Sequence, residues 1–328
     1  MKILVTDFAW NDLQIEQQML SPLNATLVAA KTGEEDELVQ LAADVQGIFT
    51  NWKRVSRRVI ENAPSCKAIV RYGVGLDNID VPFATDSGIV VANVPNYCLE
   101  EVSDHALALL LALARKVTIF DRSTKNGIYD LRLGTPFYRL RGKILGLVGL
   151  GQIGTAVARK ALGLGLKVIA FSRSGMPART GTETVEAVSF SELLNHSDYI
   201  SLHVPLTPET RHLFNTAAFR QMKPTAFLIN TARGDVIDSS ALLSALDENL
   251  IAGAALDVLP KEPPDADDPL LRHPRIVVTP HAAFNSVESL EELRMTASAE
   301  MRDILQGKKP EFVVNPDVLR HPNLRASL

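Results

Sequence analysis

The stretch Gly146-Leu147-Val148-Gly149-Leu150-Gly151-Gln152-Ile153-Gly154 decides the fold of this chain. It contains the spacing G-x-G-x-x-G, which is informative only in the right surroundings. Residues 143–148, apolar after Lys143, predict a buried strand, residues 153–162 predict a helix, and residues 166–171 predict the next strand. The glycines therefore stand at the first turn of a predicted βαβ unit.

Each glycine of this turn has a separate physical role. Gly149 would make the tight turn, Gly151 would let a pyrophosphate approach the backbone, and Gly154 would let helix and strand pack closely. The start of the helix, at Gln152 and Ile153, offers N–H groups and the positive end of the helix dipole to phosphates. The context favours a dinucleotide site over a glycine-rich turn without a ligand.

The composition is that of an ordinary globular protein. The 328 residues, 46% hydrophobic and 22% charged, are enough for two domains. A net charge of −4 gives no support to binding of nucleic acid or of an anionic membrane. The most apolar run, residues 106–114, is too short to span a bilayer.

The first residues and the two cysteines indicate in which cellular compartment we expect the protein. Residues 1–6 lead directly into a strand pattern, so we expect no targeting segment. Cys66 and Cys98 indicate neither a disulfide framework nor a zinc site, and they fit small core residues in a reducing compartment. We therefore expect a cytoplasmic protein that binds no metal.

Strand and helix patterns alternate in two series along the chain. The first series has strands near residues 3–6, 26–30, 47–50, 68–71 and 89–91, and the second runs from residue 143 to residue 281. This alternation predicts an α/β protein with two doubly wound parallel-sheet domains and a cleft between them. The expected domains are a flavodoxin-like substrate-binding domain, residues 1–98 and 286–328, and a Rossmann dinucleotide-binding domain, residues 99–285.

Three helix signals lie within this pattern. The apolar face of residues 99–115 is too broad for a solvent-facing helix, and we expect it to pack between domains or against a second subunit. Ser189-x-x-Glu192 is typical of a capping box, and Thr207-Pro208-Glu209 is typical of a helix start. Residues 287–305 form the last predicted helix, closed by Gly307 and followed by an irregular tail.

The end of the second strand of a dinucleotide fold distinguishes NAD(H) from NADP(H). An acidic residue about 20 positions past the glycines usually holds the ribose hydroxyls. This chain has Ser172-Arg173-Ser174 at that place, and its next carboxylate is Glu183. Arginine flanked by two hydroxyls would bind a 2′-phosphate. The sequence therefore favours NADP(H) over NAD(H), unless Arg173 stacks on adenine or points to solvent.

Polar side chains also stand where later strands of the second series end. Arg233 could bind a carboxylate with its planar fork of donors, or it could form a surface ion pair. His281 is a candidate proton donor because histidine titrates near neutrality, although a lone histidine is more often structural. Glu262 is the natural residue to pair with it, and Asp257 closes another apolar strand.

A second glycine-rich loop, residues 72–80, follows a strand of the first series. Its glycines, Gly73 and Gly75, do not fit a phosphate-binding pattern. Two close glycines could expose backbone N–H groups to a small anion, or they could make a simple tight turn. Spacing alone leaves both interpretations open.

Together these stretches resemble the D-isomer-specific 2-hydroxyacid dehydrogenase family over nearly the whole chain. The matching stretches, in the family's order, are residues 71–80, 93–95, 102–105, 146–154, 203–210, 230–234, 254–263 and 279–281. Within the family, Thr6-Asp7 and residues 281–286 are most similar to the branch related to the C-terminal-binding proteins. That branch contains enzymes and also transcriptional corepressors.

The resemblance implies a role for each matching residue. Arg233 would hold a 2-oxo acid through its carboxylate and carbonyl, and the backbone of Val74 and Gly75 would bind the carboxylate. His281 would donate the proton to the carbonyl oxygen during reduction, and Glu262 would hold His281. Asp257 would anchor the nicotinamide carboxamide. The other residues expected to contact the cofactor, besides the glycine turn and Ser172 to Ser174, are His203, Val204, Pro205, Thr210, Thr231, Ala232, Arg233 and His281.

Only a few residues of the sequence indicate which substrate side chain would be bound. Asn51, Trp52 and Lys53 follow the third strand pattern, and Lys53 would suit a substrate with a second anionic group. Phe284 stands where the related corepressors carry tryptophan, and it could pack on the substrate side chain or in the core.

The resemblance and the residues predict an NADP(H)-preferring reductase of small 2-oxo acids, with glyoxylate or hydroxypyruvate as the default substrate. One alternative is an NAD-linked enzyme similar to phosphoglycerate dehydrogenase or belonging to another specialised pathway. The alternative of another class is a dinucleotide-sensing binding protein similar to the corepressors. We expect a homodimer, formed through the helix at residues 99–115 and the segment after it, and no nucleic-acid or membrane partner.

Overall fold

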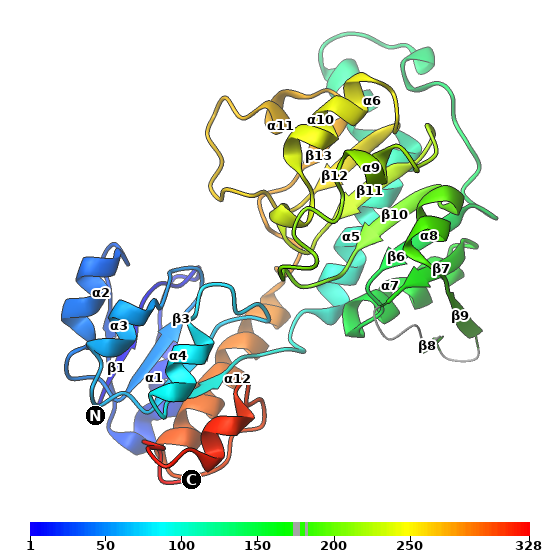
Figure 1. The fold of residues 1–328 in the computed structure, drawn as a ribbon. Helices are drawn as coiled ribbons and strands as arrows, with labels where there is room; N and C mark the ends of the chain where they lie inside the picture. The colour runs from blue at the N-terminus through cyan, green and yellow to red at the C-terminus, as the bar shows by residue number, and fades with distance from the viewer. Residues whose placement is uncertain (173–177, 181–182) are drawn as a thin grey trace. The chain divides into compact units, whose positions relative to one another are not determined.

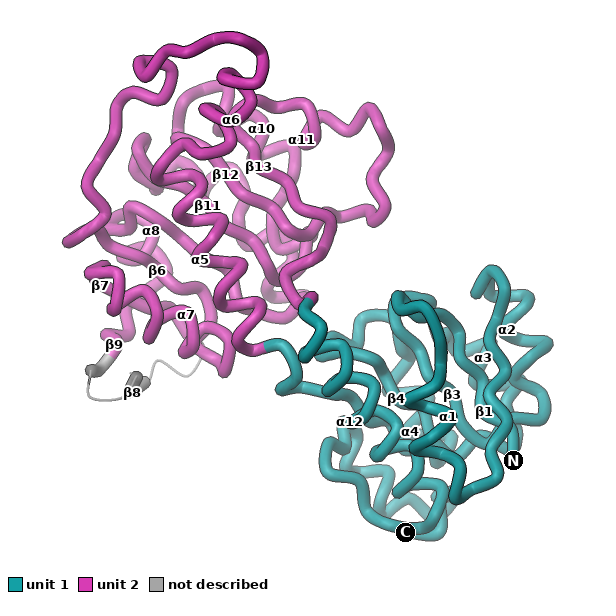
Figure 2. Tube along the Cα trace, turned by 180° about the vertical axis from the view of Figure 1, so that it is seen from behind, with its two compact units in different colours: residues 1–98, 286–328 teal, residues 99–285 magenta. Residues whose placement is uncertain are grey.

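The computed structural model describes residues 1–172, 178–180 and 183–328. They divide into two compact units (Figure 2). Unit 1 consists of Met1–Cys98 and Ser286–Leu328, and unit 2 consists of Leu99–Asn285. Each unit is described by itself.

Unit 1 contains a five-stranded parallel sheet. Its strands are β1 (Lys2–Val5), β2 (Thr26–Ala29), β3 (Gly47–Thr50), β4 (Ala68–Arg71) and β5 (Val90–Ala92). Their order in the sheet is β2-β1-β3-β4-β5, the flavodoxin-like order. All residues of β3 are buried, which explains why a fully covered parallel strand is a continuous apolar run in the sequence.

The last long helix of the chain completes unit 1. Helix α12 (Val287–Leu305) packs against α1 (Gln14–Leu20) and β4 (Figure 1). It ends before Gly307, whose φ of +77° lies in the left-handed region that glycine adopts at little cost. The other helical elements of unit 1 are η1 (Ser21–Leu23), α2 (Glu35–Ala42), α3 (Arg57–Glu61), α4 (Val81–Asp86) and η4 (Pro316–Arg320).

The chain after α12 is irregular apart from η4, as predicted, and it is tied to β5. Asn315 accepts a hydrogen bond from the Val91 N–H at 2.8 Å, and its amide group donates to the Ile89 carbonyl at 3.0 Å. The Val314 N–H also donates to the Val91 carbonyl at 2.8 Å. The tail therefore pairs with the edge of the sheet next to β5.

In the described residues, unit 2 contains one larger sheet whose strand order is β13-β12-β11-β10-β6-β7-β9-β8. All neighbouring strands are parallel except β8 and β9, which form an antiparallel edge. From β13 to β9 the order is that of a Rossmann sheet with one further strand. The strands are β6 (Ile144–Val148), β7 (Lys167–Phe171), β8 (Ala178–Thr180), β9 (Glu183–Ala187), β10 (Tyr199–Leu202), β11 (Phe227–Asn230), β12 (Gly253–Leu256) and β13 (Ile276–Val278).

The two parallel sheets confirm the predicted fold class, while one predicted helix start is wrong. Thr207 does not begin a helix, because the residues after it, 208–212, form turns instead. The Thr210 and Arg211 N–H groups both donate to the Thr207 carbonyl, and His212 then has a φ of +53°. A left-handed residue ends any helical course. By contrast, the capping box of Ser189 and Glu192 at α8 (Phe190–His196) is confirmed.

The broad apolar face of α5 (Leu99–Arg115) is explained within unit 2. This helix packs against α7 (Gln152–Gly163) and against β11 and β12 (Figure 1). Its buried residues between Ala106 and Ala114 belong to the core cluster that covers this face of the sheet. The remaining helical elements of unit 2 are α6 (Val117–Lys125), η2 (Leu131–Gly134), α9 (Thr216–Phe219), η3 (Gly234–Val236), α10 (Ser239–Asp247) and α11 (Pro269–Arg272).

Candidate active site

The glycine turn lies between β6 and α7, at the carboxyl edge of the unit 2 sheet. Gly149 has a φ of +98°, so a side chain there would be strained. A Cβ on Gly154 would lie 2.3 Å from the Gly149 carbonyl oxygen, which shows how closely helix and turn pack. A Cβ on Gly151 would meet no described atom within 4 Å. The turn thus has close packing at two glycines and open space at the one where a phosphate is expected.

Helix α7 presents backbone donors at this open space. The Thr155 N–H makes a hydrogen bond to the Gly151 carbonyl at 2.9 Å, as in the first turn of a helix. The N–H groups of Gln152, Ile153 and Gly154 precede that bond and have no intrahelical partner. Together with the helix dipole, they form a site suited to a pyrophosphate.

The other predicted cofactor residues lie at the ends of the neighbouring strands β10 and β11. The His203 carbonyl lies 2.4 Å from the place a Gly149 Cβ would take, so the end of β10 packs on the glycine turn. The Thr210 hydroxyl donates to the Pro205 carbonyl at 2.6 Å and thereby braces residues 205–210. The Thr231 hydroxyl is buried and has no hydrogen-bond partner within the described part of the chain. An unsatisfied buried hydroxyl at the carboxyl end of β11 fits a site completed by a polar ligand.

The imidazole of His203 is uncharged at neutral pH. Burial lowers the pKa of this side chain to about 4. Its Nε2 lies 2.9 Å from the Ser201 hydroxyl. The end of β10 therefore offers a neutral ring and no positive charge to a cofactor.

Asp257 ends β12 and is buried. Its Oδ1 accepts from the Thr279 hydroxyl at 2.5 Å and from the Ala282 N–H at 2.9 Å, and its Oδ2 accepts from the Ala283 N–H at 3.0 Å. Burial acts to raise the pKa of the Asp257 carboxyl, but hydrogen bonds from His105, Thr279 and the two N–H groups outweigh burial and lower it. The carboxylate thus organises the turn after β13.

The most informative pair is His281 with Glu262. The His281 Nδ1 lies 2.6 Å from the Glu262 Oε2, and the Leu259 N–H donates to Oε1 of the same carboxylate at 2.8 Å. Burial acts to raise the pKa of the Glu262 carboxyl, but the hydrogen bond and charge of His281, the Leu259 N–H and the charge of Arg233 together lower it. An ionised carboxylate only accepts, so Nδ1 carries a hydrogen and the ring's Nε2 remains for a substrate.

Arg233 lies in the loop after β11, next to the segment that carries Glu262. Asn230 shapes this loop by accepting from the Ala232 N–H and donating to the Arg233 carbonyl, both at 2.9 Å. A Cβ on Gly234 would lie 2.1 Å from the Leu259 backbone, so the loops after β11 and β12 are in contact. The structure therefore brings Arg233, Glu262 and His281 to one edge of the sheet. Phe284 packs its ring edge-on to His281, with centroids 6.2 Å apart.

Two of the predicted cofactor residues, Arg173 and Ser174, lie outside the described residues. Ser172, directly after β7, is partly buried at the same carboxyl edge as the glycine turn.

The predicted substrate residues of unit 1 lie at the carboxyl edge of its own sheet. Asn51 is buried and Trp52 is 47% exposed. The Lys53 Nζ makes an ion pair of 2.8 Å with Glu34, so its charge already has a partner. After β4, Val74 is 38% exposed, and its carbonyl accepts from the Asn93 side chain at 2.8 Å.

Sequence reasoning missed the residue that shapes the loop after β3. The Asp7 carboxylate accepts the N–H groups of Asn51, Trp52 and Lys53 at 3.0, 2.8 and 3.2 Å. Asn78, from the second glycine-rich loop, donates to the carbonyls of Asn51 and Lys53 at 3.1 and 2.9 Å. Asp7 comes directly after the first predicted strand, and parallel strands end at the same edge of a sheet. This position could have predicted that Asp7 lies near the loop after β3.

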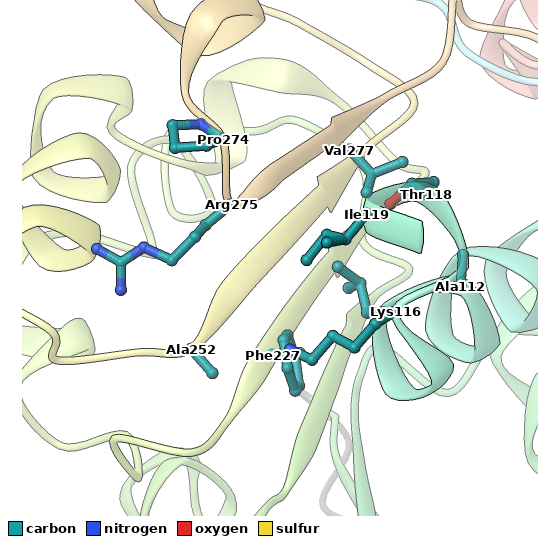
Figure 3. A pocket seen from close by; sticks show the side chains of 10 residues that line it. Ala112, Lys116, Thr118, Ile119, Phe227, Ala252, Pro274, Arg275 and Val277 are labelled. Atoms are coloured by element: carbon teal, nitrogen blue, oxygen red, sulfur yellow. The ribbon is translucent and has the colours of Figure 1, made fainter. Parts of the chain in front are cut away.

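A shallow hollow lies at the opposite edge of the unit 2 sheet. Its lining includes Lys116 between α5 and α6, Ile119 of α6, Phe227 at the start of β11 and Val277 of β13 (Figure 3). The Lys116 ammonium lies 4.5 Å from the centre of the Phe227 ring, and burial lowers the pKa of Lys116. Because it lies at the amino ends of the strands, this hollow is separate from the glycine turn.

The family model of the D-isomer specific 2-hydroxyacid dehydrogenase NAD-binding domain matches residues 107–283. The chain is 40% identical over 298 residues to the glyoxylate reductase of Thermococcus litoralis, covering 88% of this chain and 86% of that protein. The chain belongs to this family. It is accordingly an oxidoreductase of 2-hydroxy acids that uses a nicotinamide dinucleotide.

Two solved structures are similar to this chain over most of its length. An acyclic imino acid reductase in complex with NADPH and D-Arg has a TM-score of 0.85 and 29% identity, and the match covers 96% of this chain and all of that one. The D-lactate dehydrogenase of Aquifex aeolicus, in complex with NAD and lactic acid, has a TM-score of 0.86 and 27% identity over 96% of this chain and 99% of that one. The same fold thus occurs with either dinucleotide.

Two features are absent from the described part of the chain. No group of three or more histidine, cysteine, aspartate or glutamate side chains in this part of the chain is arranged to hold a metal ion. Among the described helices, none combines the length and the apolar character needed to cross a membrane.

Proposed function

We propose that this dehydrogenase is an NADP(H)-preferring reductase of small 2-oxo acids, with glyoxylate or hydroxypyruvate as its default substrates. The observation that carries the proposal is the His281–Glu262 pair, 2.6 Å apart at the edge of the sheet that also carries Arg233. The names of the glyoxylate reductase relatives support the substrate class. The relation to the C-terminal-binding-protein branch stays a prediction.

The proposed chemistry divides between the dinucleotide and the protein. When bound, the reduced dinucleotide supplies a hydride to C2 of the substrate. The guanidinium of Arg233 would bind the substrate carboxylate and carbonyl, and protonated His281 would transfer its Nε2 proton to the carbonyl oxygen. Glu262 would stabilise the imidazolium and fix the ring, as the short contact to Nδ1 allows. Reduction then requires protonated histidine and oxidation requires neutral histidine.

The observed turn fits the dinucleotide. Gly149, Gly151, Gln152, Ile153 and Gly154 would hold its pyrophosphate through backbone N–H groups. Asp257 would anchor the carboxamide, and the remaining contacts would come from His203, Val204, Pro205, Thr210, Thr231 and Ala232. We assign unit 2 the role of dinucleotide-binding domain and unit 1 the role of substrate-binding domain, with Val74, Gly75, Asn51, Trp52 and Lys53, together with Phe284 of unit 2, as substrate contacts.

The preference for NADP(H) depends on Ser172-Arg173-Ser174. We expect the purified protein to consume NADPH at least about tenfold more efficiently than NADH, because arginine binds a 2′-phosphate that a carboxylate would repel. Arg173→Ala should lower kcat/KM for NADPH and leave that for NADH nearly unchanged. Glyoxylate, hydroxypyruvate, pyruvate and phosphonopyruvate would be compared as substrates.

The matched control for this experiment is Arg220→Ala. It removes an exposed arginine of unit 2 that is far along the chain from Arg173 and from β7. It should alter neither cofactor's efficiency. A wild-type preference for NADH would refute the proposed role of Arg173. Binding of dinucleotide without turnover of any 2-oxo acid would refute the proposed reductase function.

We further propose a homodimer, supported by exposed apolar side chains between residues 117 and 138. Tyr129 is 94% exposed and Leu131 is 78% exposed, and Val117 and Ile128 are each more than half exposed. Large apolar side chains exposed this far are typical of an interface when they lie together on the surface. The expected solution mass is that of two chains, measured by analytical ultracentrifugation, and Leu131→Glu should shift it toward one. A wild-type mass of one chain would contradict the proposal.

A cytoplasmic location is the last part of the proposal. Both cysteines, Cys66 and Cys98, are buried thiols in the core of unit 1. Buried thiols of this kind fit a reducing compartment.

A further inference from the structure

His105 of α5 contacts the strand ends that carry the proposed acid. Its Nε2 lies 3.0 Å from the Thr279 hydroxyl and 3.3 Å from the Asp257 Oδ1. None of the roles proposed above uses this histidine, although residues 102–105 belong to a stretch that matches the family.

The hydrogen-bond directions in this cluster follow from counting hydrogens. The Thr279 hydroxyl has one hydrogen, and it is directed to Asp257 at 2.5 Å. The contact from His105 to Thr279 therefore needs a hydrogen on Nε2 of His105. His105 is thus a donor toward both Thr279 and Asp257.

Asp257 in turn fixes three successive backbone N–H groups. Its carbonyl accepts from the His281 N–H at 2.8 Å, and its carboxylate accepts from Ala282 and Ala283 at 2.9 and 3.0 Å. His281 has a φ of +52°, a conformation that costs a residue other than glycine about 1–3 kcal/mol. Such a conformation persists only when its surroundings hold it, and Asp257 provides three of the contacts that do so.

We propose that His105 is a positioning residue for His281: with Thr279, it holds the Asp257 carboxylate in the place from which that carboxylate fixes the turn at residues 281–283. The inference rests on the proposed function, in which His281 gives the proton. Loss of the donor on His105 would release one side of the carboxylate and displace the His281 ring. A displacement of about 1 Å can lower a catalytic rate about 100-fold.

The test compares His105→Leu with His105→Gln, because glutamine can place an N–H near the position of Nε2. We expect His105→Leu to lower kcat for 2-oxo acid reduction about 10- to 100-fold, with dinucleotide Kd changed less than about threefold, and His105→Gln to recover most of the rate. Hydrogen exchange of dinucleotide-free protein supplies a readout independent of activity. The peptide covering residues 279–285 should exchange about tenfold faster in His105→Leu and near wild type in His105→Gln.

Ser103→Ala is the matched control on the same helix. Ser103 is buried and donates to the Glu100 carbonyl, so its loss should change neither kcat nor exchange at residues 279–285. If His105→Leu does not fold, Thr279→Val and Thr279→Ser are compared instead. Valine removes the other side-chain donor to the Asp257 carboxylate, and serine keeps it.

Each outcome bears on the inference. Wild-type kcat in His105→Leu, with or without faster exchange, would overturn it. Equal losses in His105→Leu and His105→Gln would also overturn it, because the N–H would then not matter. His281→Asn, measured in parallel, separates the two failures: if it is inactive while His105→Leu is fully active, only the inference about His105 fails. If His281→Asn keeps its rate, His281 is not the proton donor, and both that part of the proposed function and the inference about His105 fail.

Discussion

His281→Asn is expected to lower kcat for 2-oxo acid reduction by about 10²–10⁴-fold, the range for loss of a general acid. Asparagine is the best replacement because it tolerates the left-handed conformation, and His281 has a φ of +52°. The loss should therefore reflect the missing proton and not a rearranged turn. Dinucleotide affinity, measured by the fluorescence of bound NADPH, should change much less than kcat.

The pH dependence should change together with the rate. Reduction takes up a proton, which His281 gives in the proposed mechanism, so the wild-type rate should fall as pH rises, and this fall should be absent from His281→Asn. On the acid side, the lowered pKa of the Glu262 carboxyl keeps it ionised beside His281 to a lower pH than an ordinary glutamate.

The structure offers a matched control in the same unit. His212 is exposed and has a φ of +53°, so His212→Asn makes the same exchange in the same backbone conformation outside the proposed site. It should retain wild-type kcat within about twofold. Full activity of His281→Asn would exclude His281 as the proton donor.

The second large effect concerns stability: Arg294→Met is expected to lower the free energy of unfolding of unit 1 by about 3–5 kcal/mol. Arg294, on α12, donates to both oxygens of Glu16, on α1, at 3.0 and 2.8 Å. The Glu16 side chain is fully buried, so removal of the guanidinium leaves a charge without its partner inside the protein. Arg294 also donates to the Asp12 carbonyl at 2.8 Å and lies 5.2 Å from the Trp10 ring.

Both tryptophans of the chain, Trp10 and Trp52, belong to unit 1, so tryptophan fluorescence during urea denaturation reports on this unit. Arg302→Met removes a more exposed arginine from the same helix and should cost less than about 0.5 kcal/mol. Adding Glu16→Gln to Arg294→Met should recover part of the stability, because the unpaired charge is then gone. A loss in Arg294→Met no larger than in Arg302→Met would show that the buried pair contributes little.

Much of the fold could be predicted because its signals are local. Strands such as β3 and β4 are covered on both faces, so they are short apolar runs bounded by polar residues. Helices α5 and α12 have the bounds that their apolar patterns predicted. The helix start at Thr207 failed because proline at a first-turn position fits a β-turn as well as a helix, and the chain then turns at His212.

The proposed site was predictable only in part. Glu262 and His281 were expected to pair, and the structure joins them at 2.6 Å. Asp7, His105 and Thr279 received no role, because nothing in their local pattern shows what their side chains contact. Lys53 was considered for a second anionic group of the substrate, while its ion pair with Glu34 was not foreseen.

The sequence by itself determined the succession of strands and helices, the glycine turn and the family, since each depends on short patterns or on motifs in order. Only the tertiary structure decided which side chains meet. His105 and Thr279 are separated by 174 positions, and Arg294 and Glu16 by 278. Such contacts depend on how helices pack on a sheet, and packing geometry fixes the neighbours of a side chain without leaving a periodic pattern in the chain.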